Sequence, residues 1–384
     1  MIGGTGVLSS AVTKEAIRHG IDVIMINRGH NMKAVPSNVE LIKTDRSDYK
    51  FIASVLKGRY FDAVIEYLIV SEKQIRESFE FYKDYTKQYF FISSCAVYDT
   101  RTGKPCDEDS KKELPIWSYS VEKWRSEKLL MKLAEGYDTN ITIIRPCITY
   151  GNSRIPYGIS PKYGYHWTLA ARILAGKPIV RWNKGENRSN MTRVEDFAVG
   201  VVGLIGNTKA YNDAFNVCGE ETPTYNDVID TMSTYLGNKA VTIDIDKEFY
   251  AKEIPERRGE LLGGRCIDAI NNNDKIKAVV PEFKQNIFIK EGIKLTLDAY
   301  NAENYQKGID WAFDADTDRI ILKWCKQNKI DAKQYNLEFV DYLGTATPNN
   351  KRQYWLTMHK RNLFIIIYNQ ILYYSHALVR KITK

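Results

Sequence analysis

The sequence predicts an α/β fold in which a doubly wound parallel sheet is followed by a smaller α/β lobe and a C-terminal helical tail. The first observation is that short apolar segments alternate with helix-like segments over residues 1–150, a pattern typical of parallel sheets covered by helices. The second is a run of glycines, Gly3, Gly4 and Gly6, directly before a helical pattern. The third is that residues 330–384 differ from the rest, because basic residues are followed there by apolar and aromatic ones.

The strands and helices can be placed in order along the chain. The first helix is expected to end at Gly20, since glycine commonly follows the last turn of a helix. Ser93 and Ser94 come directly after an apolar strand, at the edge where parallel α/β sheets bind ligands. We expect strands at 22–26, 41–43, 61–67, 88–92, 142–146 and 214–217, and helices at 7–19, 72–84, 118–134 and from 194.

The glycine run predicts a nucleotide-binding turn of the Rossmann-like type. Glycines between a strand and a helix allow the backbone to approach a pyrophosphate, which then lies on the helix N-terminus. The third glycine position of this pattern holds Ser9, which is small enough for close packing. Only Met1 and Ile2 precede Gly3, so we expect a dinucleotide-binding domain at 1–150 with its first strand largely missing. Because that strand belongs at the centre of the sheet, its loss would weaken folding and cofactor binding.

The end of the second strand bears on the choice of cofactor. An acidic residue at this position would bind a ribose 2′-hydroxyl, but the sequence has Asn27 followed by Arg28. Loss of the carboxylate removes repulsion of a 2′-phosphate, and an arginine can bind one. The expected cofactor is therefore NAD(P), with NADP favoured over NAD, although an arginine in a loop is as often only solvated.

A serine, a tyrosine and a lysine form the candidate catalytic group. Tyr119 and Lys123 are four residues apart and so share one helix face. A nearby ammonium favours the phenolate and lowers the tyrosine pKa from its usual value of about 10. Ser94, at a strand end, would hold the substrate oxygen whose proton Tyr119 takes. This arrangement suits hydride transfer at a carbon bearing a hydroxyl, although a lone Tyr-x-x-x-Lys is more often a solvated helix face.

Residues 151–190 change in character and are rich in Gly, Pro, Tyr, Trp and basic residues. Such a mixture suits a flat ring with phosphates or single-stranded nucleic acid, and a buried aromatic cluster is the plain alternative. Residues 191–217 return to an alternating pattern and are expected to rejoin the dinucleotide-binding domain. We expect 151–190 and 218–300 to form a substrate lobe and 301–384 to form a helical tail.

Composition limits the classes of function. The formal net charge of +8 over 384 residues suits an anionic ligand, a membrane surface or solubility, and no DNA partner is expected. The six cysteines include no C-x-x-C pair, so we expect reduced thiols in a cytoplasmic protein and no metal site. We recognise no signal peptide, and no uninterrupted apolar stretch reaches the roughly 18 residues of a spanning helix.

The C-terminal tail combines basic and apolar residues. Residues 363–374 are apolar and aromatic, interrupted by Asn369 and Gln370 and flanked by basic residues. Such a helix suits peripheral contact with a membrane interface. Docking on its own domain or on a partner subunit is the alternative that we favour.

Taken together, these stretches resemble the extended short-chain dehydrogenase/reductase superfamily, in its NAD-dependent epimerase/dehydratase branch, over roughly residues 1–300. The details around Asn27 and Asp45 look like an atypical subgroup that includes plant stem-loop-RNA-binding relatives. The motifs occur in the expected order: Gly3-Gly4-Thr5-Gly6, Asp45 after the third strand, Ser93-Ser94-x-x-Val97-Tyr98, Tyr119-x-x-x-Lys123, Arg145-Pro146-x-x-x-Tyr150-Gly151, Val194-x-Asp196 and Asn216-Val217-x-Gly219.

The resemblance implies roles for the candidate catalytic group. Tyr119 would be the general acid/base, and Ser94 would hydrogen-bond the substrate's reacting oxygen. Lys123 would hold the nicotinamide ribose and lower the pKa of the tyrosine. The resemblance also implies a homodimer, formed through the helix that carries Tyr119.

The resemblance further implies binding residues. Gly3, Thr5 and Gly6 would cradle the pyrophosphate, and Asp45 would meet the adenine. Substrates in this branch are usually nucleotide sugars. The nearest match to the arginine that binds their phosphates in relatives is Arg188, whose register is off by about one residue.

One departure from the family pattern narrows the chemistry. Dehydratase members have an Asp-Glu pair directly after the reactive hydroxyl residue, where this sequence has Cys95 and Ala96. Neither can serve as that acid or base, so dehydration is not expected. The leading hypothesis is an NAD(P)-dependent nucleotide-sugar epimerase, and the alternatives are a nucleotide-sugar keto-reductase or a non-catalytic, RNA-binding member of the fold.

Overall fold

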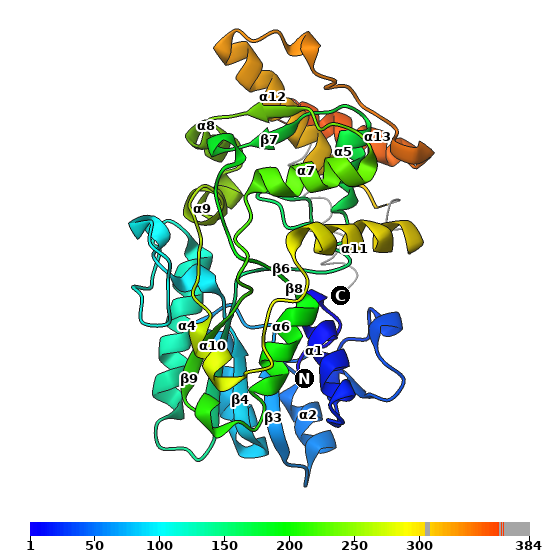
Figure 1. Cartoon of the computed structure of the whole chain (residues 1–384). Helices are drawn as coiled ribbons and strands as arrows, with labels where there is room; N and C mark the ends of the chain where they lie inside the picture. The colour runs from blue at the N-terminus through cyan, green and yellow to red at the C-terminus, as the bar shows by residue number, and fades with distance from the viewer. Residues whose placement is uncertain (304–307, 361, 363, 365–384) are drawn as a thin grey trace.

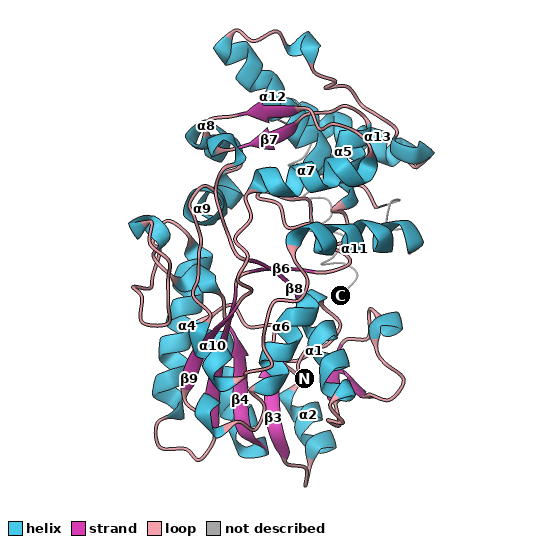
Figure 2. Ribbon diagram, viewed as in Figure 1, coloured by secondary structure: helices cyan, strands magenta, loops and turns pink. Residues whose placement is uncertain are grey.

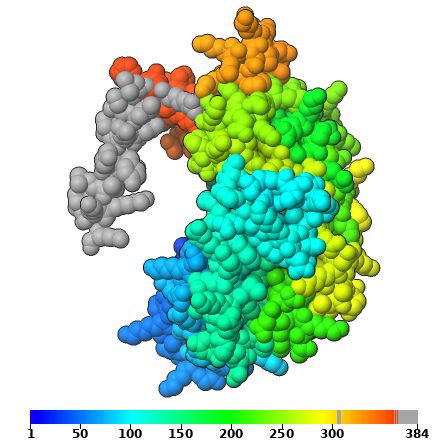
Figure 3. Space-filling model, turned by 90° about the vertical axis from the view of Figure 1, so that its left-hand side faces the viewer, coloured from blue at the N-terminus to red at the C-terminus, as the bar shows by residue number. Residues whose placement is uncertain are grey.

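The computed structural model describes residues 1–303, 308–360, 362 and 364, which fold into two lobes (Figure 1). The lobe drawn below carries a parallel sheet between helices, and the lobe drawn above is mostly helical with one short strand pair (Figure 2). In the space-filling view the two lobes lie directly against each other (Figure 3). The predicted doubly wound α/β class is confirmed.

The main sheet is parallel throughout. Its strands β3, β4, β5 and β9 are neighbours in that order, and β1 pairs separately with β2. Ile2 lies between the two sets and forms parallel bridges with Ile26 of β1 and Glu66 of β3. The strand bounds are β1 Ile24–Asn27, β2 Glu40–Lys43, β3 Phe61–Glu66, β4 Thr86–Ile92, β5 Asn140–Pro146 and β9 Asp213–Val217.

The centre of this sheet is therefore held by Met1 and Ile2 without an extended strand. The Met1 amine donates a hydrogen bond to the Ile24 carbonyl at 2.7 Å, and burial lowers its pKa to about 6. The neighbouring Glu66 carboxyl is also buried, which raises its pKa. A charge buried this deep in a sheet is costly unless it is paired.

Helices cover both faces of the sheet because its strands are apolar on both faces. Phe90 and Ile92 of β4 pack on the side of α1 and α6, and Tyr89 and Phe91 pack on the side of α2, α3 and α4. This alternation is the two-residue period of a strand buried on both faces. The helix bounds are α1 Val7–Arg18, α2 Tyr49–Leu56, α3 Glu72–Tyr82, α4 Ser118–Ala134 and α6 Val194–Gly203.

The second lobe has its own apolar core, to which α5, α7, α11, α12 and strands β7 and β10 all contribute. A short parallel pair, β6 with β8, leads from the sheet lobe into it (Figure 2). The bounds are β6 Ile148–Tyr150, α5 Trp167–Leu174, β7 Ile179–Arg181, β8 Met191–Arg193, α7 Tyr225–Leu236, β10 Thr242–Asp244, α8 Lys247–Glu253, α9 Arg258–Glu260, α11 Ile289–Ala302, α12 Trp311–Asn328 and α13 Pro348–Met358. Between α9 and α11 the chain returns to the sheet lobe, where α10, Asp274–Val279, packs beside β9.

Four buried charges join α12 to the α5 segment. Arg172 lies 2.9 Å from Asp318, and Lys177 lies 3.1 Å from Asp314. All four side chains are almost completely excluded from solvent. The charges balance within the cluster, so α12 packs as part of the second lobe.

The apolar stretch 363–374, apart from Phe364, lies outside the described residues, and so does the membrane contact predicted for it. Within the described ranges, no helix combines the length and apolar character needed to span a bilayer.

Candidate active site at the carboxyl edge of the sheet

Ser94 lies just beyond the carboxyl end of β4, where the sequence predicts it. Its side-chain oxygen accepts a hydrogen bond from the Ala96 amide at 3.1 Å and so caps a short 3₁₀ turn over Cys95–Val97. This cap uses the oxygen as an acceptor and leaves its hydrogen to be donated elsewhere. Ser94 is thereby held at the sheet edge with its hydroxyl oriented by the backbone.

The first turn of α4 places Tyr119 beside Ser94. Burial at the hydroxyl end raises the pKa of the Tyr119 phenol, whereas a hydrogen bond with Ser94 acts to lower it. The residue as a whole keeps 36% of its surface exposed, which leaves an approach for a ligand. The structure thus brings the predicted serine and tyrosine into contact.

Lys123 lies one turn further along α4 and is buried. Its Nζ donates to the carbonyls of Ile69 at 2.6 Å and Ile92 at 2.8 Å, and it lies 5.8 Å from the centre of the Tyr119 ring. Burial lowers the pKa of Lys123 to about 8. An ammonium has three donors, so two anchor the side chain to strand ends and one remains for a ligand.

Beneath these residues lies a buried charged network that sequence reasoning missed. Glu127, four residues after Lys123 on α4, receives two hydrogen bonds from Arg145 of β5, at 2.6 and 3.1 Å. Ser93 also donates to Glu127, and Arg145 donates to the Tyr98 hydroxyl at 2.8 Å. The sequence pattern that could have revealed Glu127 is its spacing of four residues from Lys123, which is itself four residues from Tyr119 on the same helix face. The network ties α4 to the ends of β4 and β5, and so fixes the tyrosine relative to Ser94.

The glycine run forms a tight turn into α1. Gly3 and Gly4 have φ of +111° and +92°, and a side chain on Gly4 would lie 2.5 Å from Met25. Gly6 is the residue that precedes the first turn of α1, and its amide donates to the Ser9 hydroxyl at 3.0 Å. Thr5 lies between them. Only glycine fits this turn, which brings bare backbone to the N-terminus of α1, where a pyrophosphate is commonly bound.

The residues predicted to meet the adenosine half of the cofactor follow β1 and β2. Asn27 holds the turn itself, since its amide donates to the Gly3 carbonyl at 3.3 Å and accepts from the Gly29 amide at 2.7 Å. Arg28 is exposed next to it. Asp45 accepts hydrogen bonds from Ser47, which lower its carboxyl pKa, as does the nearby charge of Arg28.

The predicted phosphate ligand Arg188 is exposed at the edge of the second lobe. Its guanidinium donates to the Thr222 hydroxyl at 2.5 Å and to the Thr222 carbonyl at 3.3 Å. Two other arginines, Arg154 and Arg265, are the ones whose charges act on Tyr119. They were missed because Arg154 lies in a loop and Arg265 ends a short π-helical segment, Leu261–Arg265, and the sequence pattern reveals the path of neither.

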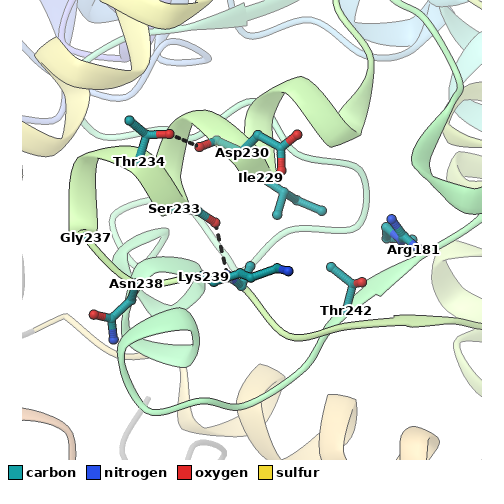
Figure 4. Close-up of a pocket in the computed structure, with 10 residues that line it drawn as sticks. Arg181, Ile229, Asp230, Ser233, Thr234, Gly237, Asn238, Lys239 and Thr242 are labelled. Atoms are coloured by element: carbon teal, nitrogen blue, oxygen red, sulfur yellow. Dashed lines mark hydrogen bonds between the residues drawn. The ribbon is translucent and has the colours of Figure 1, made fainter.

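A surface hollow lies elsewhere, between the C-terminal end of α7 and β10 (Figure 4). Its polar groups are engaged locally, since Thr234 donates to the Asp230 carbonyl at 2.8 Å and Arg181 pairs with Asp244 at 2.9 Å. None of its lining residues belongs to the catalytic group. Across the described ranges, no three His, Cys, Asp or Glu side chains gather as a metal site requires.

Comparison with known proteins gives a family match over more than half of the chain, including the strands of the main sheet. The profile of the NAD dependent epimerase/dehydratase family matches residues 1–218. A curated protein of Arabidopsis thaliana, chloroplast stem-loop binding protein of 41 kDa b, is 28% identical over 239 residues. That alignment spans 59% of this chain and 59% of the relative.

Solved structures share the fold at low sequence identity. The epimerase Mth375 of Methanothermobacter thermautotrophicus has a TM-score of 0.65 at 18% identity, over 80% of this chain and 94% of its own. A UDP-glucose 4-epimerase of Thermotoga maritima has a TM-score of 0.63 at 19% identity, over 79% and 98%. A UDP-glucuronic acid 4-epimerase of Bacillus cereus, solved with UDP-glucuronic acid and NAD, has a TM-score of 0.62 at 16% identity, over 79% and 98%.

Proposed function

Because the chain belongs to the NAD-dependent epimerase/dehydratase family, we propose that it is an NAD(P)-dependent epimerase of a nucleotide sugar. The observation that carries the proposal is that Tyr119 and Lys123 of α4 meet the end of β4, where Ser94 lies, at the carboxyl edge of the sheet. Transient oxidation and reduction of one carbon would then invert its configuration.

The chain's own residues fit a bound dinucleotide. Gly3 and Gly4 have positive φ and a Cβ on Gly4 would clash with Met25, so the backbone alone forms this turn, and the N-terminus of α1 attracts the pyrophosphate. When bound, the cofactor would supply the hydride acceptor and donor. Lys123 has one donor left for the nicotinamide ribose, because its other two hydrogen bonds go to Ile69 and Ile92.

Proton transfer would fall to Tyr119. Ser94 would donate a hydrogen bond to the substrate oxygen while the tyrosine takes the proton from that oxygen and later returns it. The buried Lys123 ammonium would favour the phenolate form as the proton moves. After oxidation the keto sugar would rotate, so that the hydride returns to its other face.

The residues after Ser94 favour epimerisation over dehydration. Cys95 is buried, and its thiol donates to the Arg145 carbonyl at 3.1 Å, while Ala96 has no acidic group. Elimination of water would need an acid and a base at these positions. A nucleotide-sugar keto-reductase on the same site is distinguished by its stoichiometry, since a reductase consumes one NAD(P)H per product and an epimerase consumes none.

The test is a panel of nucleotide sugars followed by NMR, with NAD and NADP added in turn. We expect interconversion of two epimers by the wild type and loss of at least 10³-fold in rate in Tyr119→Phe. Tyr137→Phe is the matched control, because Tyr137 is exposed beyond the C-terminal end of α4. Full activity of Tyr119→Phe would refute the relay.

Cofactor choice can be tested at Arg28. We infer a preference for NADP for two reasons. Arg28 is exposed beside the turn that Asn27 holds, and position 27 itself carries an amide where a carboxylate would repel a 2′-phosphate. Arg28→Ala should weaken NADP binding about tenfold and leave NAD binding unchanged, measured by calorimetry. Equal loss for both cofactors would contradict a 2′-phosphate contact.

A homodimer through α4 is a further part of the proposal. Met131 is 45% exposed on this helix, which supports an apolar contact there. Light scattering should give twice the 44.2 kDa chain mass, and Met131→Glu should return the monomer. A wild-type monomer at all concentrations would contradict this arrangement.

A second candidate function is RNA binding without catalysis, favoured by the name of the curated relative. It predicts affinity for a stem-loop RNA that falls steeply between 50 and 200 mM salt, because phosphate contacts release counterions. RNA binding by a protein that neither binds a dinucleotide nor turns over any sugar would favour this function over the epimerase.

A further inference from the structure

Three cysteines gather at the carboxyl edge of the sheet, on three neighbouring strands. Cys95 follows β4, Cys147 follows β5, and Cys218 follows β9. The parallel registers align them, because Ile92 pairs with Ile144 and Pro146 pairs with Val217. The three cysteines therefore lie at the sheet edge that also carries Ser94, although they are far apart in the sequence.

Cys147 and Cys218 are direct neighbours. Each is the next residue after the paired Pro146 and Val217. Neighbouring strands lie about 4.8 Å apart, within the roughly 4.4–6.8 Å between Cα atoms that a disulfide spans. The Cys218 thiol donates to the Asn271 carbonyl at 3.6 Å, and the two sulfurs are close enough for each to shift the pKa of the other.

The surroundings favour the thiolate on Cys147. Its sulfur lies 3.1 Å from the Thr192 hydroxyl oxygen, which itself accepts a hydrogen bond from the Gly219 amide at 2.7 Å. When Cys147 is a thiolate, the Thr192 hydroxyl is therefore free to donate its hydrogen to the sulfur. Although burial acts to raise the pKa of Cys147, hydrogen bonds from Cys218 and Thr192 outweigh it and lower that pKa. The pKa of Cys218 is raised, chiefly by its hydrogen bond to Cys147, so Cys218 stays a thiol.

Access also distinguishes Cys147 from the other cysteines. It is half-buried, whereas the remaining five are buried. A metal role is not indicated, because no cluster of three ligands is found among the described residues.

We propose that Cys147 is an oxidant-sensitive modification site, at which a hydroperoxide produces a reversible Cys147–Cys218 disulfide. The Cys147 thiolate attacks the peroxide oxygen, giving a sulfenic acid and releasing hydroxide. The Cys218 sulfur then attacks the sulfenic sulfur, so that an S–S bond forms and water leaves. Two electrons pass from the two thiols to the peroxide, and a dithiol reverses the reaction.

Such a bond would join the ends of β5 and β9 at the floor of the candidate active site. Oxidation should therefore lower dinucleotide affinity, and reduction should restore it. The thiol chemistry itself does not depend on the proposed epimerase activity, so it can be tested without a substrate.

The experiment treats the reduced full-length protein with hydrogen peroxide, blocks remaining thiols with iodoacetamide and maps the peptides by mass spectrometry. We expect a linked pair containing Cys147 and Cys218, two hydrogens lighter than the separate peptides and absent after dithiothreitol. Cys147→Ser should abolish the link, and Cys325→Ala, in α12, should leave it unchanged. A link from Cys147 to Cys95, or no link at all, would overturn the proposal.

Two further measurements guard against a folding defect in the variants. In Cys218→Ala the sulfenic acid has no partner, so dimedone should trap it on Cys147. In the unmodified wild type, iodoacetamide at pH 7 should label Cys147 at least tenfold faster than any other cysteine. Labelling of another cysteine first would contradict the assignment whatever the variants do.

Discussion

Burial of Lys123 predicts an unusual dependence of stability on pH. The lysine is 3% exposed, and its pKa falls from 10.5 to about 8 on folding. At pH 7 both states carry the proton, and the folded state bears the cost of a buried ammonium. As the pH rises through about 8, the folded lysine loses its proton while the unfolded lysine keeps its own until about 10.5, so stability increases across this window.

The magnitude follows from the two pKa values. The difference between 10.5 and about 8 corresponds to about 3 kcal/mol in total. Between pH 7 and pH 9.5 the folded state gains about 2 kcal/mol of this amount relative to a protein without the lysine. Lys123→Met keeps the length of the side chain and removes the titration.

Urea unfolding of both proteins at several pH values between 7 and 9.5 measures the effect. The wild type should gain about 2 kcal/mol over Lys123→Met across that range, whatever their offset at pH 7. Lys128→Met is the control, since Lys128 is exposed on the same helix. Its free energy of unfolding should change with pH in parallel with that of the wild type. Parallel curves for the wild type and Lys123→Met would show that burial does not lower this pKa.

Three other substitutions test the buried framework by urea unfolding. Glu127→Ala leaves Arg145 buried without its carboxylate and should cost about 3–5 kcal/mol, a value that a change under 1 kcal/mol would contradict. Asp314→Asn removes one anion from the four-charge cluster and should cost a similar amount, with exposed Asp331→Asn as the neutral control. Gly292→Ala would place a Cβ 2.0 Å from the Tyr150 hydroxyl and should destabilise the protein by about 1–3 kcal/mol; an unchanged midpoint would mean that α11 shifts freely.

The parts of the site that sequence patterns predict are local ones. The helix expected at 118–134 is α4, Ser118–Ala134, and the strand expected at 88–92 ends where β4 ends, so Ser94 falls at the sheet edge. Periodicity carries this information because neighbours along an element share its faces.

Partners that come from separate elements could not be predicted in this way. The pairing of Glu127 with Arg145 depends on how α4 crosses β5, and neither element alone shows it. Arg154 acts on Tyr119 from a loop, whose path depends on the packing of the second lobe. The sequence suggested Arg188 as the phosphate ligand because it lies nearest to a motif, while its side chain is bonded to Thr222.

The four-charge cluster also has a consequence for the order in which the chain folds. Arg172 is separated by 142 residues from Asp314, and Lys177 by 137 from the same aspartate. At a synthesis rate of about 5–20 residues per second, the two cations are synthesised roughly 7–28 s before Asp314. During that interval the second lobe cannot bury these two cations with their partners, so its core can close only after α12 has been synthesised.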